Sequence, residues 1–426
     1  MILRLKLPLI SSGLGKSCLW LLGVGLVVAA FPSRFGHILW IPLVCFTPVI
    51  LCIRATPTLW KKVFLTWGLF QLLFIWMFAY IPPHLPPGIP NSNQFWSIWL
   101  LILLGPVIYS GLFLLAIRWL SRVLGGALLA GSIMVLGEQL FFGMLFKFPL
   151  TFAITVFDQP VLIQFAALGG WAAVSWLLWS SNFYFSNLEY IRERRVSMAL
   201  GAACLLGVIG FGFWRIASFN HDVGHRVSRL AVVQTNTSWV EMGLAGISPL
   251  YFHDHIGNVA KMTRVAATLN PAAIVFPEGV AGRGLGDQMV FNKIQSISKE
   301  VPFPILLECR VTTPENSSAS AAIWMQNGGI ERQRYKTFTV PFIEATGTEN
   351  RNVNVYFGID RDIDIAALIC FEILFSKPSR DLAVEGADIL ICHANTSYFG
   401  QSNWPILQLC FNFSVKLGFT QKPIFG

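Results

Sequence analysis

The stretch IDIAALICFEILF, residues 363–375, decides the fold of the second half of this chain. It is an apolar run, rich in β-branched residues, that leads to Cys370. A run of this kind is typical of a buried strand. We therefore expect the Cys370 thiol to emerge where the strand gives way to a loop. A thiol in that position is a candidate nucleophile if a base and a cation lie beside it.

Two other stretches supply a candidate base and a candidate cation. AAIVFPEG places Glu278 at the end of a second apolar run, and YKTFTVPF places Lys336 beside an aromatic residue. A base turns a thiol into a thiolate, and a cation stabilises the oxyanion that forms when the thiolate attacks a carbonyl. Each residue also has an ordinary interpretation, because carboxylates and lysines are mostly exposed and free cysteines commonly pack as small hydrophobic residues.

The order Glu, Lys, Cys, each in its own local signature, resembles the carbon–nitrogen hydrolase (nitrilase) superfamily. Within it, the sequence is most similar to apolipoprotein N-acyltransferases, in which such a domain follows a bundle of membrane helices. The resemblance implies an α-β-β-α sandwich with catalytic roles for Glu278, Lys336 and Cys370. It also implies a set of supporting or substrate-binding residues, which are Glu344, Phe371, Glu372 and Asn395.

The C-terminal part departs from the family's pattern in two ways. In NTSYFG, relatives usually have an aspartate and a tryptophan where Thr396 and Tyr398 stand, which leaves the fit of the substrate open. Apolipoprotein N-acyltransferases also continue with more strands and a last membrane helix, whereas this sequence ends 26 residues after Gly400. We therefore expect either a domain at 228–426 that is incomplete, weakly folded and of low activity, or a shorter branch such as the conjugal-transfer TraB proteins.

The composition places part of the chain in a membrane. Of the 426 residues, 54% are hydrophobic and only 12% are charged, which is outside the range of ordinary soluble proteins. Seven apolar segments approach the ~20 residues that a helix needs to cross a bilayer. These predicted spans make up a membrane domain at 1–216, and they are 17–31, 38–53, 63–81, 95–117, 123–146, 161–185 and 198–214.

The charged loops predict the orientation of these spans in a bacterial inner membrane. Basic residues gather before the first span and after the second, fourth and sixth, which all fall on one side. The positive-inside rule puts that side, and the N-terminus, in the cytoplasm, so that the domain after the seventh span is extracytoplasmic. The net charge of +9 does not indicate nucleic-acid binding, because no basic patch with interleaved aromatic residues occurs.

Several other residues are candidates for a functional or a packing role. Glu138 is an ionisable group inside a predicted span, which marks either a functional or bundle-facing position or a carboxylate that is capped or reaches the interface near a helix end. Gly169 and Gly170 would let neighbouring helices approach closely. His253 and His255 lie on different faces of a predicted helix, so a metal site is not expected. The eight cysteines show neither metal-ligand nor disulfide spacing, and no cofactor is expected.

The resemblance implies an acyltransferase that works through a thioester on Cys370. The acyl donor would be a phospholipid, and the acceptor would be an amine, by family likeness the N-terminal amine of a lipid-modified cysteine on a lipoprotein. Two alternatives stay open. The chain would be a membrane-anchored amidase if water resolved the thioester, and it would be a conjugal-transfer component if the site had a different or lost activity.

Overall fold

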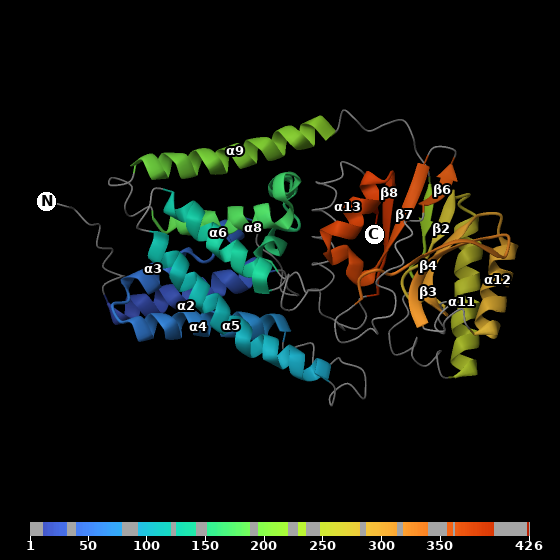
Figure 1. Cartoon of the computed structure of the whole chain (residues 1–426), viewed down its shortest axis with the longest axis horizontal. Coiled ribbons are helices and arrows are strands. Elements are labelled where there is room, and N and C mark those ends of the chain that lie inside the picture. The colour runs from blue at the N-terminus through green and yellow to red at the C-terminus, as the bar shows by residue number, and fades with distance from the viewer. Residues whose placement is uncertain are drawn as a thin grey trace. The chain divides into compact units, whose positions relative to one another are not determined.

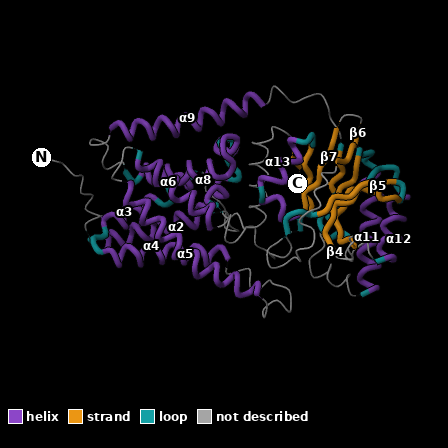
Figure 2. Tube along the Cα trace, viewed as in Figure 1, coloured by secondary structure: helices purple, strands orange, loops and turns teal. Residues whose placement is uncertain are grey.

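The computed structural model describes most of the chain, and its described residues form two compact units. One unit ends at Phe219 and contains only helices, whereas the other begins at Arg229 and contains all the described strands (Figures 1 and 2). The described residues are 12–31, 40–78, 93–120, 125–141, 151–187, 195–219, 229–235, 248–281, 287–312, 318–339, 356–360, 363–395 and 424–425.

The first unit is a bundle of helices of unequal length. The longer ones are α2 (Gly13–Ala30), α4 (Leu59–Phe78), α5 (Asn93–Leu120), α6 (Gly126–Glu138), α8 (Ala166–Phe185) and α9 (Arg195–Phe219). The shorter ones are η1 (Ile41–Leu43), α3 (Thr47–Ala55), η5 (Phe152–Val156) and α7 (Pro160–Ile163). Within the described residues, three helical stretches are long and apolar enough to cross a membrane, namely Gly13–Ala30, Ile102–Leu120 and Met198–Ser218.

Two of the seven predicted spans are not single continuous helices. In place of a helix over 38–53 the structure has the 3-10 turn η1, a turn and the nine-residue helix α3, which is only ~14 Å long at 1.5 Å per residue. Within 161–185, the chain leaves helical geometry at Gly169 and Gly170, where Gly170 has φ 64° and ψ −156°. The glycine pair therefore breaks the helix, whereas we had expected it to serve close helix packing.

Aromatic side chains fill the centre of the bundle around Glu138. The ring of Trp179 lies 4.6 Å from that of Phe46 and 4.7 Å from that of Phe152, measured between centroids. Glu138 is buried there, and its Oε1 accepts hydrogen bonds from Trp179 Nε1 at 2.8 Å and from the Phe152 N–H at 3.2 Å. Glu138 thus faces the inside of the bundle and ties α6 to α8 and η5.

The second unit contains two sheets. The first has the order β1 (Leu230–Val232), β2 (Ala273–Val275), β3 (Ile305–Thr312), β4 (Ser318–Gln326) and β5 (Gly329–Tyr335), and the second has the order β6 (Tyr356–Asp360), β7 (Ile363–Ile369), β8 (Ile389–His393) and β9 (Ile424–Phe425). The strands β1, β2 and β3 are parallel, as are β7, β8 and β9, and the remaining pairs are antiparallel.

Helices cover the outer faces of both sheets. The helices α11 (Pro249–Ala267) and α12 (Gln288–Glu300) pack on the first sheet, and α13 (Ser376–Val384) packs on the second. Between the sheets lies a core to which Leu306 and Trp324 contribute from one side and Ile365 and Ile391 from the other. Figure 1 shows the resulting order of layers, helix–sheet–sheet–helix, which confirms the predicted α-β-β-α arrangement.

The period of two along a strand decides which side chains enter the space between the sheets. In β3, Ile305, Leu307 and Cys309 pack toward α11 and α12, whereas Leu306 packs toward the second sheet. Glu308 has the same parity as Leu306 and therefore also faces the second sheet. Ala322 of β4 also faces the second sheet, and it pairs with Arg334 of β5. Arg334 and Lys336, two residues later, therefore lie on this face as well.

Candidate active site

Glu278 begins a turn that two residues separate from the end of β2, and hydrogen bonds with three other segments hold this turn. The Gly279 N–H donates to Glu308 Oε2 at 2.7 Å, and His255 Nε2 donates to the Val280 carbonyl at 2.7 Å. Glu278 Oε2 itself accepts the Asn395 N–H at 2.9 Å. Because Gly279 has φ 76°, in the left-handed region, the turn favours glycine there. The carboxylate is therefore fixed from several directions.

Cys370 directly follows the end of β7, as the sequence predicts. Its φ of 48° is a left-handed conformation that non-glycine residues seldom adopt, and it turns the chain from the strand into the 3-10 helix η7 (Cys370–Leu374). The thiol lies within hydrogen-bonding reach of the Glu278 carboxylate and within the electrostatic field of Lys336. The structure thus brings together the three predicted residues, which stand on segments far apart in the sequence.

The environment of Cys370 keeps its thiol protonated. Burial raises the pKa of the thiol well above its ordinary value, and the negative charge of Glu278 raises it further, while Lys336 acts in the opposite sense. A resting thiolate is therefore disfavoured. Nucleophilic attack at this site requires that a neighbouring base take the proton as the new bond forms, and Glu278 is the carboxylate in contact with the thiol.

Lys336 directly follows β5 and continues its pairing, and its side chain lies between the sheets. Its backbone N–H donates to the Ser320 carbonyl at 2.9 Å, which continues the pairing of β4 with β5, and its side chain is only 2% exposed. An ammonium group in such a dry setting acts on nearby charges more strongly than it would in water. It interacts there with both Cys370 and Glu308.

Glu372 joins the Cys370 turn to the segment that carries Lys336. Its carboxylate accepts two hydrogen bonds from Arg334, at 2.7 and 3.1 Å, and two from the N–H and Oγ1 of Thr337, both at 2.6 Å. The Ile369 N–H donates to it as well, at 2.9 Å. Burial alone would raise the pKa of Glu372, but Arg334 and Thr337 outweigh burial and lower it. A carboxylate so fully bonded supports the site and has little capacity left for substrate.

Glu308 is a buried carboxyl at this site that the sequence did not single out. It is 3% exposed, and burial together with the charge of Glu278 raises its pKa to about 8, against the lowering effects of the Gly279 N–H, Lys336 and Ser320. The signal that marks it is an acidic residue in an otherwise apolar strand, PILLECR. A polar residue on the inner face of a strand needs partners there, and Glu308 finds them.

His393 is a second buried group that the sequence did not indicate. It ends β8 beside Ile369, and its Nδ1 donates at 2.6 Å to the carbonyl of Phe276, the residue that follows β2 of the other sheet. Because a carbonyl only accepts, the proton lies on Nδ1, and Nε2 carries none and is buried without a hydrogen-bond partner among the described residues. Burial lowers the pKa of His393 to about 4, so the imidazole is neutral. The histidine joins the two sheets close to Cys370.

The other predicted residues are placed as follows. Phe371 packs edge-on against Phe375, with centroids 5.2 Å apart, and thus belongs to the core. Asn395 acts on Glu278 through its backbone N–H, whereas Glu344 lies outside the described residues. Of the histidine pair, His253 is exposed and His255 is buried. Within the described ranges no group of His, Cys, Asp and Glu residues forms a possible metal site.

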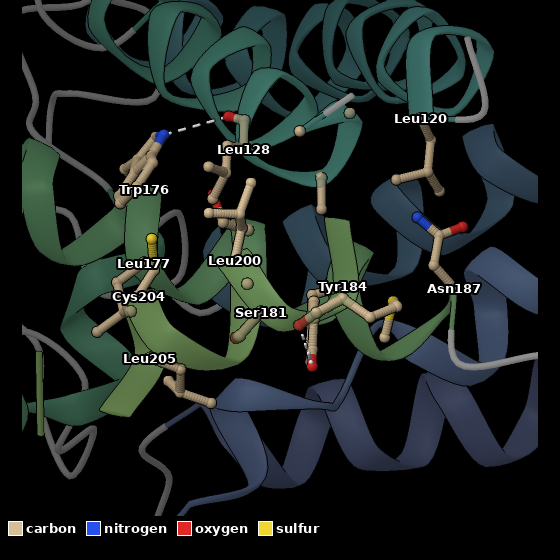
Figure 3. Close-up of a pocket in the computed structure, with 16 residues that line it drawn as sticks. Leu120, Leu128, Trp176, Leu177, Ser181, Tyr184, Asn187, Leu200, Cys204 and Leu205 are labelled. Carbon is tan, nitrogen blue, oxygen red and sulfur yellow. Dashed lines mark hydrogen bonds between the residues drawn. The ribbon is translucent and has the colours of Figure 1, made fainter. Parts of the chain in front are cut away.

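The helical unit contains a separate apolar pocket (Figure 3). It has an empty volume of about 680 Å³, part of it open to solvent, and lies among the end of α5, α6, α8 and the first half of α9. Figure 3 shows Trp176 at its edge, donating to the Leu128 carbonyl at 3.2 Å. It is lined within this unit alone by residues such as Leu120, Tyr184, Met198 and Cys204, so it is not part of the Glu278–Lys336–Cys370 site.

Comparison with known proteins gives matches only among solved structures. No protein-family model matches the sequence, and no curated protein matches it. The similar structures include an amidase of the nitrilase superfamily from Nesterenkonia sp. AN1, at 13% identity and a TM-score of 0.33 over 40% of this chain and 67% of the amidase. Another is the glutamine-dependent NAD+ synthetase from Acinetobacter baumannii, at 16% identity and a TM-score of 0.27 over 34% of this chain and 30% of the synthetase. At these values neither the family nor the activity of this chain follows from the likeness.

Proposed function

We propose that this chain is a cysteine-dependent acyltransferase that moves a fatty acyl group from a phospholipid to an amine. The observation that carries the proposal is the meeting of the Glu278 carboxylate, the Lys336 ammonium and the Cys370 thiol at the ends of three strands. These groups are a base, an electrostatic stabiliser and a nucleophile, the three parts that acyl transfer needs. Their order along the chain is the one that resembles the nitrilase superfamily.

The first half-reaction forms a thioester. Glu278 takes the proton of the Cys370 thiol while the sulfur attacks the carbonyl carbon of the acyl ester. The carbonyl oxygen becomes an oxyanion, and the buried ammonium of Lys336 stabilises it. When this intermediate collapses, the ester C–O bond breaks and the departing lysophospholipid oxygen takes the proton from Glu278. General-base catalysis is typically worth 10²–10⁴-fold in rate, on the order of what loss of Glu278 should remove.

The second half-reaction returns the enzyme to its starting state. An amine attacks the thioester carbon, Glu278 takes a proton from the nitrogen, and Lys336 again stabilises the oxyanion. The C–S bond then breaks, and the leaving sulfur recovers its proton from Glu278. We propose the N-terminal amine of a lipid-modified cysteine on a lipoprotein as the acceptor, because the sequence motifs resemble those of apolipoprotein N-acyltransferases.

The choice of a lipid donor over a soluble amide is supported by the rest of the chain. Three of its described helical stretches are long and apolar enough to cross a membrane. Phospholipids are the acyl esters that a membrane presents at high local concentration. We therefore propose that the chain is a multi-pass inner-membrane protein and that its lipid bilayer supplies the acyl donor.

Intact mass analysis of the full chain tests the proposal. The protein would be purified in detergent with a phospholipid that carries one isotopically labelled acyl chain, and then mixed with a peptide that begins with a diacylglyceryl cysteine. We expect a labelled acyl adduct that maps to Cys370 before the peptide is added, and labelled N-acyl peptide afterwards. Cys370→Ser should form no thioester, and Cys309→Ser, a change in a buried cysteine of β3, should form it as the parent chain does.

Each other outcome would decide against part of the proposal. An adduct on Cys309 or Cys392 would remove Cys370 as the nucleophile. An adduct that the peptide cannot resolve, but that decays to free fatty acid, would identify a hydrolase in which water is the acceptor. No adduct with any phospholipid, but one with small amides, would identify a membrane-anchored amidase.

A further inference from the structure

Glu308 belongs to the candidate site, but the two half-reactions above do not use it. Its side chain points into the space between the sheets and its Oε2 accepts the Gly279 N–H at 2.7 Å. That N–H belongs to the residue directly after Glu278. The hydrogen bond therefore fixes the peptide plane that leads out of the candidate base, in a turn whose glycine has φ 76°.

We propose that Glu308 is a positioning residue, which holds the turn so that Glu278 meets the Cys370 thiol, and which stays uncharged so that it adds no further negative charge beside Glu278, Lys336 and the thiol. This inference rests on the function proposed above, since it assigns Glu308 a role in the activation of Cys370. Glu308 acts through the turn that carries Glu278.

The charges that face Glu308 show why its protonation state matters. Glu278 faces it from the turn after β2, Lys336 from the end of β5, and the Ser320 hydroxyl from β4. Arg334, a second cation between the sheets, is paired with Glu372. If Glu278 and Glu308 were both ionised, two negative charges would lie beside the Lys336 ammonium group. The surplus charge would oppose the thiolate and the oxyanion, which both develop negative charge.

A proton on Glu308 removes the surplus negative charge and keeps the hydrogen bond from the Gly279 N–H. A protonated carboxyl keeps a carbonyl oxygen that accepts the Gly279 N–H. The raised pKa of Glu308 described above agrees with a neutral group near pH 7. A glutamine resembles this neutral acid in shape and in acceptor capacity, whereas a leucine has a similar volume and no acceptor.

Alkylation of Cys370 by iodoacetamide tests the inference without any acyl transfer. The purified full chain would be treated between about pH 6 and about pH 10, and the rate at Cys370 followed by peptide mass mapping. Glu308→Gln and Glu308→Leu would be compared with Glu300→Gln. Glu300 is the last residue of α12 and pairs with the exposed Arg264, so the last change removes an exposed charge from the outer helices of the same unit.

We expect the two Glu308 variants to differ in kind. Glu308→Gln should react like the parent chain near pH 7, and its alkaline midpoint should move to lower pH by about one unit, because the negative charge that Glu308 gains at higher pH is gone. Glu308→Leu should react about tenfold more slowly near pH 7, because the Gly279 N–H loses its acceptor and Glu278 its position. Glu300→Gln should change neither the rate nor the midpoint.

Two results would overturn the inference. One is a pH profile of Glu308→Gln that superimposes on that of the parent chain, and the other is a Glu308→Leu variant, folded by circular dichroism, that reacts as fast as the parent near pH 7. If Glu308→Leu does not fold, the profile of Glu308→Gln still decides. A parent chain that forms no acyl adduct but shows these alkylation differences would refute the proposed function alone.

Discussion

At the scale of single residues, the candidate site contains more buried ionisable groups than its chemistry requires. Glu278, Lys336 and Cys370 would perform the reaction, whereas Glu372, Arg334 and Glu308 hold them in place. A buried ion pair often contributes little net stability compared with hydrophobic residues, because both partners lose their hydration. Its geometry, however, is specific. The Arg334–Glu372 pair fixes the Cys370 turn against the strand end that carries Lys336.

We expect Glu372→Gln to destabilise the α/β unit strongly. The change leaves Arg334 as an uncompensated charge between the sheets, and breaking a buried pair in this way costs about 3–5 kcal/mol. The matched control is Asp381→Asn, which removes an exposed carboxylate that pairs with Lys377 on α13 and should cost less than about 1 kcal/mol. Urea unfolding followed by circular dichroism would measure both. Equal effects for the two changes would contradict the role that we give to Glu372.

Two buried groups of this unit, His393 and Glu372, predict that acid destabilises it in two separate ranges of pH. The pKa of His393 is about 4, so the unfolded chain binds a proton that the folded one does not as pH falls from about 6.5, and the contribution of His393 to stability is lost down to about pH 4. The pKa of Glu308, raised to about 8, acts in the opposite sense over this range, so the His393 step should be visible in Glu308→Gln. The pKa of Glu372 is lowered on folding, so its contribution is present above about pH 4.3 and is lost as pH falls through the folded value. Adding Glu372→Gln to Glu308→Gln should remove the lower step and keep the upper one, as measured by urea unfolding at each pH.

At the scale of elements, the strands that the sequence predicted are those with apolar inner faces. The runs AAIVFPE, PILLECR and IDIAALICFE all became strands near their predicted places. The strand β5, with the sequence GIERQRY, carries no such signal, because it is a largely exposed edge strand. The sequence therefore did not predict Arg334, although the motif around Lys336, two residues later, predicted that lysine. Its partner Glu372 stands across the sandwich, and only the packing of the two sheets brings them together.

Helix α8 shows, within the helical unit, the same limit of prediction from local sequence. Its composition predicts one span over 161–185, because Gly169 and Gly170 are compatible with a helix as well as with a break. The structure has a break there, and Gly170 takes φ 64° with ψ −156°, a conformation almost confined to glycine. The packing of the neighbouring helices, which the local sequence does not contain, decides between the two.

We expect Gly170→Ala to destabilise the helical unit by about 1–3 kcal/mol, because alanine would be strained in that conformation. Gly207→Ala is the matched control, since Gly207 lies inside the regular helix α9 and an added Cβ would meet nothing within 4 Å. That change should leave stability unchanged or raise it by up to about 1 kcal/mol. Thermal unfolding in detergent would compare them. If Gly170→Ala is the more stable variant, the break in α8 is not a feature of the folded protein.

At the scale of the whole molecule, one chain joins a bundle rich in apolar helices to an α/β unit with a buried polar site. The seven spans predicted from the sequence would put the N-terminus in the cytoplasm and the α/β unit on the opposite side of the membrane. Lipoprotein acceptors would then be met outside the cytoplasm.

Reporter fusions test this orientation. Arg192, Arg194 and Arg195 follow the sixth predicted span, and the positive-inside rule places such a cluster in the cytoplasm. The stretch Met198–Ser218 is long and apolar enough to cross the membrane once after that cluster. We therefore expect alkaline phosphatase fused after residue 220 to be active, since it needs an oxidising compartment to form its disulfides, and the same enzyme fused after Arg194 to be inactive. Green fluorescent protein at the two positions should give the reverse pattern. An active phosphatase at Arg194 with an inactive one at residue 220 would place the α/β unit in the cytoplasm, where a lipoprotein acceptor outside the membrane could not reach Cys370.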